Sequence, residues 1–79
     1  MFSEAVVPTF SVDLHRADHT RHYSIRPLVG SGWEVRIEQD RELTRLACYR
    51  DWHRVERALA TFRLEVRELT ARGWAVVEH

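Results

Sequence analysis

The clearest pattern in the chain is an apolar stripe with helical spacing in its C-terminal third. Apolar residues recur there at alternating steps of four and three, and at about 100° per residue they fall within a roughly 80° arc. They are Val55, Leu59, Phe62, Val66 and Leu69. Asp51 is a suitable N-cap, and Gly73 suits the left-handed position after the last turn, with Trp74 packing back in a Schellman ending. The pattern predicts one complete helix whose apolar stripe covers a single surface.

Strand-like alternation precedes this helix. The clearest example is the run in which Trp33, Val35 and Ile37 alternate with charged residues, so that one face is apolar and the other charged. An earlier run covers residues 23–29, where Pro27 predicts an edge strand or a bulge because proline cannot donate to a ladder. These runs predict two strands of an antiparallel sheet.

A third run, residues 43–49, alternates less regularly. We favour the orientation in which Leu46 and Cys48 point toward the core and Arg45 points outward. The opposite orientation is left open, and it would exchange the two faces of the strand.

Together these elements predict an α+β fold. It is a three- or four-stranded antiparallel meander covered on one face by a single long C-terminal helix. Residues 21–79 form a single β-β-β-α domain, and residues 1–20 are either a flexible segment or an extra edge strand. The expected core comprises Tyr23, Ile25, Trp33, Val35, Ile37, Val55, Leu59, Phe62, Val66, Leu69 and Trp74.

Apolar residues outside this core suggest an interface. Phe10, Val12 and Leu14 alternate with polar residues, and Leu64 lies nearly opposite the helical stripe. In one interpretation the N-terminal residues form a strand that adds to the sheet edge of a second copy. In the other they form a fourth strand of the same chain, beside residues 43–49. The first interpretation predicts a homodimer with these four residues in its interface.

Length and composition restrict the class of protein. A single domain of 79 residues buries only about 60–65% of its unfolded surface, so association would help to stabilise it. Cys48 has no cysteine partner, which favours a reducing compartment. No apolar run approaches the roughly 20 residues of a membrane span. We therefore expect a cytoplasmic protein without a membrane partner.

Acidic and basic residues balance at twelve each, and every basic residue is arginine. Exclusive use of arginine is consistent with codon bias in a GC-rich bacterial genome. Nucleic-acid-binding domains are usually net positive, because contacts to phosphates supply much of their affinity. Nucleic acid is therefore a possible partner, but it is not the favoured one.

Arg26, Arg36 and Arg45 are the candidate nucleic-acid contacts, because they are expected on the open sheet face. Over residues 21–72, a three-stranded sheet backed by a helix resembles the layout of plant AP2-type domains and phage integrase arm-binding domains. The resemblance concerns layout alone, without shared sequence motifs. It implies strands in the major groove, with Arg and Trp side chains reading DNA.

His15, His19 and His22 are the candidate metal ligands, and Asp13 and Asp18 are interspersed among them. Imidazole and carboxylate groups suit zinc, but this segment lacks the helical pattern that would gather the rings on one face. We expect a solvated connector there, with no metal and no cofactor.

No pattern in the chain indicates catalysis. The sequence lacks a nucleophile–base constellation, a glycine-rich phosphate loop and paired cysteines with metal spacing. The sequence therefore favours a small non-catalytic protein-interaction module that associates with itself or with another protein. The alternative is a nucleic-acid-binding regulator that uses arginines on the open sheet face.

Overall fold

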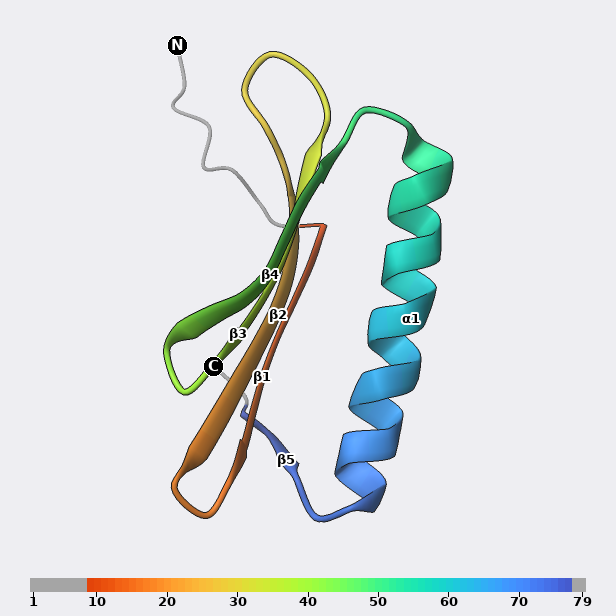
Figure 1. The fold of residues 1–79 in the computed structure, drawn as a ribbon. Coiled ribbons are helices and arrows are strands. Elements are labelled where there is room, and N and C mark those ends of the chain that lie inside the picture. Colours follow the sequence, from red (N-terminus) through yellow and green to blue (C-terminus); the bar gives the residue numbers. More distant parts are fainter. Residues whose placement is uncertain (1–8, 78–79) are drawn as a thin grey trace, which may run out of the picture.

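The computed structural model describes residues 9–77 as one antiparallel sheet with a helix along one face (Figure 1). The elements in chain order are β1 (Phe10–Arg16), β2 (His19–Pro27), β3 (Trp33–Gln39), β4 (Glu42–Tyr49), α1 (Trp52–Ala71) and β5 (Ala75–Val77). Across the sheet the strands run in the order β4-β3-β2-β1-β5. The α+β class and the single long helix are confirmed, but the sheet has five strands instead of three or four.

Both ends of α1 follow the local signals in the sequence. The N–H of His53 donates to the Asp51 carboxylate at 3.0 Å, which satisfies one of the unpaired donors of the first turn. At the other end Gly73 has φ of 100°, and the N–H of Trp74 donates to the carbonyl of Leu69 at 3.0 Å. This is the Schellman ending that the sequence predicts.

The N-terminal strand lies elsewhere in the sheet than expected. β1 pairs along its whole length with β2, and Phe10 lies opposite Ile25. β5 then pairs with the outer side of β1 at residues 13–15. The prediction of a strand beside residues 43–49, or of an extra edge strand, is therefore wrong for residues 10–16. Residues 1–8 of the expected N-terminal segment lie outside the described residues.

Internal placement of β2 also corrects the interpretation of Pro27. β2 lies between β1 and β3, so it is not an edge strand. Pro27 is its last residue, where a missing N–H interrupts the ladder least.

The favoured orientation of β4 is wrong. Ala47 lies opposite the buried Val35 and Arg45 lies opposite the buried Ile37, so both face the helix. Leu46 and Cys48 lie opposite Arg36 and Glu34 on the other face. A bulge causes the difference, since consecutive β3 residues pair with Arg45 and Leu43 and leave Thr44 as an extra residue. The alternation of side chains therefore changes phase within the strand.

The core lies between the sheet and α1. Its buried members are Leu14, Tyr23, Ile25, Val35, Ile37, Val55 and Phe62. Phe62 of the helix contacts the ring of Tyr23, with centroids 4.9 Å apart. Trp33, Leu59, Val66, Leu69 and Trp74 pack against this cluster as partly buried residues, in agreement with the sequence. Leu14 belongs to this core, although the sequence placed it in an interface.

Candidate functional site

The β4 edge is the most exposed regular element of the sheet. Six of its eight residues are exposed, and no strand among residues 9–77 pairs with its outer side. Two apolar side chains on this strand face solvent, since Leu43 is 48% exposed and Leu46 is 50% exposed. Natural sheets usually protect such edges with charge, proline or a covering element, so a long exposed edge with apolar side chains is a candidate pairing surface.

The bulge divides the β4 edge into two parts. The hydroxyl of Thr44 donates to the carbonyl of Ile37 at 3.1 Å, which anchors the extra residue to β3. Beyond the bulge, residues 45–49 pair regularly with β3. We call this five-residue stretch the regular edge. It is long enough for a second strand to pair with it. At the opposite edge, the described part of β5 comprises Ala75–Val77.

The open sheet face, which lies opposite α1, carries a ladder of paired charges. The Arg26 Nε atom lies 3.1 Å from the Glu34 carboxylate. Arg36 lies within 3.8 Å of Glu34 and 3.9 Å of Glu38. Arg26 and Arg36 are therefore on the predicted face, but each has an acidic neighbour there. Arg45, the third candidate nucleic-acid contact, lies on the helix-covered face because of the phase of β4.

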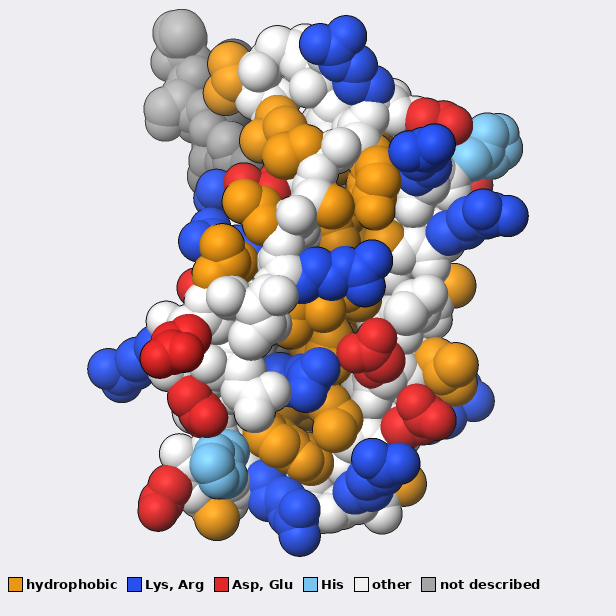
Figure 2. Space-filling view, viewed as in Figure 1, with side chains coloured by type: hydrophobic (Ala, Val, Ile, Leu, Met, Phe, Trp, Pro, Cys, Tyr) orange, Lys and Arg blue, Asp and Glu red, His pale blue; other side chains and the backbone are white. Residues whose placement is uncertain are grey.

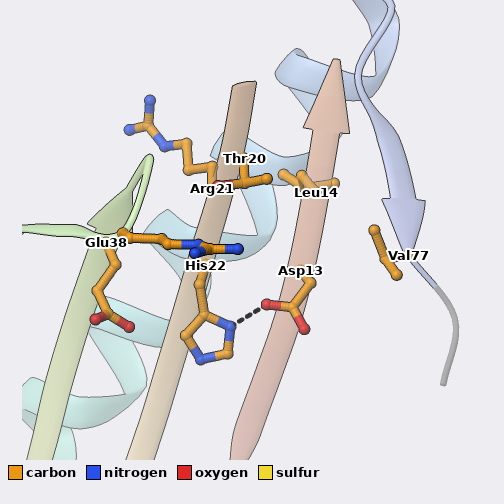
Figure 3. A pocket seen from close by; sticks show the side chains of 8 residues that line it. Asp13, Leu14, Thr20, Arg21, His22, Glu38 and Val77 are labelled. Carbon is orange, nitrogen blue, oxygen red and sulfur yellow. Dashed lines mark hydrogen bonds and ion pairs between the residues drawn. The ribbon is translucent and has the colours of Figure 1, made fainter. Parts of the chain in front are cut away.

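A pocket of about 500 Å³ opens at one end of the sheet, lined in part by Asp13, His22 and Glu38. These three residues lie in one row, since Asp13 and Glu38 are the register partners of His22 on the two neighbouring strands. Figure 3 shows the His22 ring turned toward Asp13, to which its Nδ1 atom hydrogen-bonds. Ser11 and Ser24 line a neighbouring hollow together with His22. Within residues 9–77, however, no hydrogen bond joins the His22 ring to a serine or cysteine side chain.

The three histidines named as metal candidates have different surroundings. His22 bonds to Asp13, His19 lies 3.2 Å from the Asp40 carboxylate, and His15 is exposed opposite Thr20. Within the described ranges, no group of three or more His, Cys, Asp or Glu side chains is arranged to hold a metal ion. His15 and His22 lie on the same face of the sheet but in different rows of the β1–β2 register, and His19 lies on the other face.

Asp40 stabilises the turn between β3 and β4. Its carboxylate accepts a hydrogen bond from the N–H of Thr20 at 3.0 Å, and His19 approaches its other oxygen. The hydrogen bond from Thr20, followed by that from His19, lowers the pKa of Asp40 from its ordinary value. The ionised carboxylate thus ties this turn to the start of β2.

The predicted interface residues lie mostly within the fold. Leu14 is only 1% exposed, while Phe10 and Val12 pack against the core. Leu64 is 55% exposed on α1. The exposed residues Leu43 and Leu46 were missed. Nothing in the sequence marks the bulge at Thr44, which turns Leu46 to the open face on which Leu43 already lies.

Two broader findings complete the description of the chain. No helix within residues 9–77 is long and apolar enough to cross a membrane. Comparisons of the chain with known protein families, with characterised proteins and with solved structures found no match.

Proposed function

We propose that this protein is a small non-catalytic interaction module that forms a homodimer by antiparallel pairing of its β4 strands. The observation that carries the proposal is the exposed β4 edge with its half-exposed leucines. Pairing with a second copy would satisfy the outward backbone groups and cover apolar surface. It would produce a continuous sheet of ten strands, five from each copy.

The regular edge is suited to pairing with itself. Its central residue is Ala47, and a two-fold axis there places Leu46 opposite Cys48 of the partner subunit. On the other face, the same axis places Arg45 opposite the aromatic ring of Tyr49 of the partner subunit, a favourable combination of cation and ring. The two Arg45 residues would lie about 14 Å apart at 3.4 Å per residue. That separation exceeds the Debye length of about 8 Å at physiological salt.

Nucleic-acid binding is supported less well by the same geometry. Glu34 accompanies both Arg26 and Arg36, and the net charge of the chain is zero. Carboxylates between the arginines reduce the positive potential that a phosphate backbone requires.

Solution mass tests the proposal. We expect light scattering to give twice the 9.4 kDa mass of the chain at micromolar concentrations. Leu46→Lys adds a charge at the pairing edge and should give a monomer, because lysine on an edge strand opposes pairing. Leu64→Lys is the matched control on α1 and should remain dimeric. A monomeric wild-type chain, or a dimer insensitive to Leu46→Lys, would contradict β4 pairing.

Cysteine cross-linking tests the register. In a Cys48→Ser background, Ala47→Cys places the new thiol beside its own copy across the two-fold axis. Air oxidation should therefore give a covalent dimer on a non-reducing gel. Leu64→Cys in the same background is the control and should remain monomeric on the gel. Absence of the Ala47→Cys cross-link in a chain that is dimeric by mass would place the axis elsewhere.

A further inference from the structure

A groove runs between β4 and α1 on the helix-covered side of the sheet. It has a volume of about 360 Å³, and its lining includes the apolar side chains of Val35, Ala58 and Phe62. Figure 2 shows hydrophobic side chains visible between the sheet and the helix, with basic side chains lying across them. A volume of this size is within the range of sites that bind small molecules.

Three arginines surround this groove, and we call them the groove arginines: Arg45, Arg54 and Arg57. Arg45 comes from β4, and the other two lie one helical turn apart on α1. The groove lining contains no acidic residue. None of the ion pairs found among residues 9–77 involves a groove arginine.

Two groove arginines lie near the start of α1. Arg54 and Arg57 are in its first two turns, at the positive end of the helix dipole. Asp51, the N-cap, and Glu56 line a neighbouring hollow that these two arginines also line, and neither acid lines the groove itself. Arg54 is held near β4, since its guanidinium carbon lies 5.9 Å from the centre of the Tyr49 ring. A bound anion would relieve the mutual repulsion of these cations.

From this arrangement we infer that the groove binds a small organic anion, with its phosphate or carboxylate group among the groove arginines and an apolar body on the groove floor. Guanidinium groups form paired, charge-assisted hydrogen bonds with both kinds of head group. The apolar body would contact Ala58 and the ring of Tyr49, which are partly exposed in the groove lining above the buried Phe62 and Val35. Arg45 and Tyr49 border both this groove and the proposed pairing edge, but the other two groove arginines lie on α1. The inference therefore applies to the monomer as well as to the dimer.

Isothermal titration of the full chain with four probes tests the inference. Phenyl phosphate and benzoate carry both parts of the expected ligand, inorganic phosphate carries the charge alone, and benzyl alcohol carries the ring alone. We expect one of the first two probes to bind at one molecule per chain and about tenfold or more tightly than either partial probe. The tighter of the two identifies the preferred head group.

Two variants of equal charge locate the site. Arg45→Gln/Arg54→Gln/Arg57→Gln should weaken binding of the better probe by about tenfold or more, since it removes every groove arginine. Arg63→Gln/Arg67→Gln/Arg72→Gln removes the same charge from elsewhere on or just after α1 and should bind as the wild type does. Circular dichroism would verify that both variants remain folded.

Three results would overturn the inference. The first is that neither phenyl phosphate nor benzoate binds, and the second is that both bind no more tightly than inorganic phosphate. The third is an equal loss of affinity for the better probe in the two triple variants. Repeating the titration with Leu46→Lys separates this result from the dimer proposal. Anion binding should persist in that variant even though its dimer is expected to dissociate.

Discussion

The arginines on the open face of the sheet and those in the helix-side groove have the same chemistry but different neighbours. Arg26 and Arg36 lie within 4 Å of carboxylates on β3. The groove arginines surround a lining without acidic residues. Internally paired charges are mainly consistent with a solvated structural face, whereas converging unpaired charges are consistent with binding an anion. The overall charge of zero conceals this difference, because it averages over both regions.

The largest expected change in the free energy of unfolding distinguishes substitutions on the helix-covered face of the sheet from those on the open face. Phe62 is 1% exposed at the floor of the groove, and Phe62→Ala should lower the free energy of unfolding by about 3–5 kcal/mol. Leu46→Ala on the open face should cost much less, because Leu46 is already half exposed. Urea denaturation followed by circular dichroism measures both. Similar losses for the two variants would contradict the placement of the core.

The next effect concerns an arginine of the covered face that does have an acidic partner. Arg21 lies 3.6 Å from the Glu65 carboxylate, to which the buried hydroxyl of Tyr23 donates at 2.9 Å. Glu65→Ala should cost about 1–3 kcal/mol, because it leaves that hydroxyl without an acceptor. Adding Tyr23→Phe to Glu65→Ala should recover part of the lost free energy of unfolding, which urea denaturation measures. A double variant no more stable than Glu65→Ala alone would show that the hydroxyl is not the cause.

The same tyrosine predicts a loss of stability in alkali. Burial, and then the hydrogen bond to Glu65, raise the pKa of Tyr23 to about 12 from its ordinary 10.0. The folded state holds the hydroxyl proton of Tyr23 more tightly than the unfolded state does. The protonated hydroxyl therefore contributes fully to the free energy of unfolding below about pH 10, and this contribution is lost as pH rises toward 12. Tyr23→Phe should be less sensitive to pH in this window, as measured by unfolding at each pH.

A smaller effect compares the two sets of arginines directly. Arg26→Gln on the open face should lower the free energy of unfolding by about 0.2–1 kcal/mol, because it removes a solvent-exposed ion pair. Arg57→Gln in the groove should leave stability unchanged or raise it, because it removes a repulsive charge. The difference should shrink as salt concentration rises. An equal loss in both variants would remove the distinction between the two regions.

The smallest expected change in stability concerns the carboxylate of Asp40, which belongs neither to the open face nor to the groove. The pKa of Asp40 is lowered by its hydrogen bonds, so the stabilisation is present above its ordinary pKa and is lost as pH falls through the lowered value. Asp40→Asn should therefore be less stable than the wild type near neutral pH, and the gap should narrow below about pH 4. A gap independent of pH would contradict this role of the carboxylate.

The sequence by itself determined α1 and β3. A helical stripe, a side-chain cap at Asp51 and a glycine at position 73 act within a few residues of one another, so a local pattern is sufficient. The strict alternation from Trp33 to Ile37 similarly assigned one face of β3 to the core, and the buried Val35 and Ile37 agree with it.

Only the tertiary structure decided the position of β1 and the phase of β4. Phe10, Val12 and Leu14 read as a strand, but which neighbour they pair with depends on contacts far away in the chain. In β4 the extra residue Thr44 changes the alternation, and the pairing with β3 that places it has no local signal. The same phase moves Arg45 beside two arginines of a distant helix. The groove arginines could not be grouped from sequence because strand pairing and helix packing bring them together.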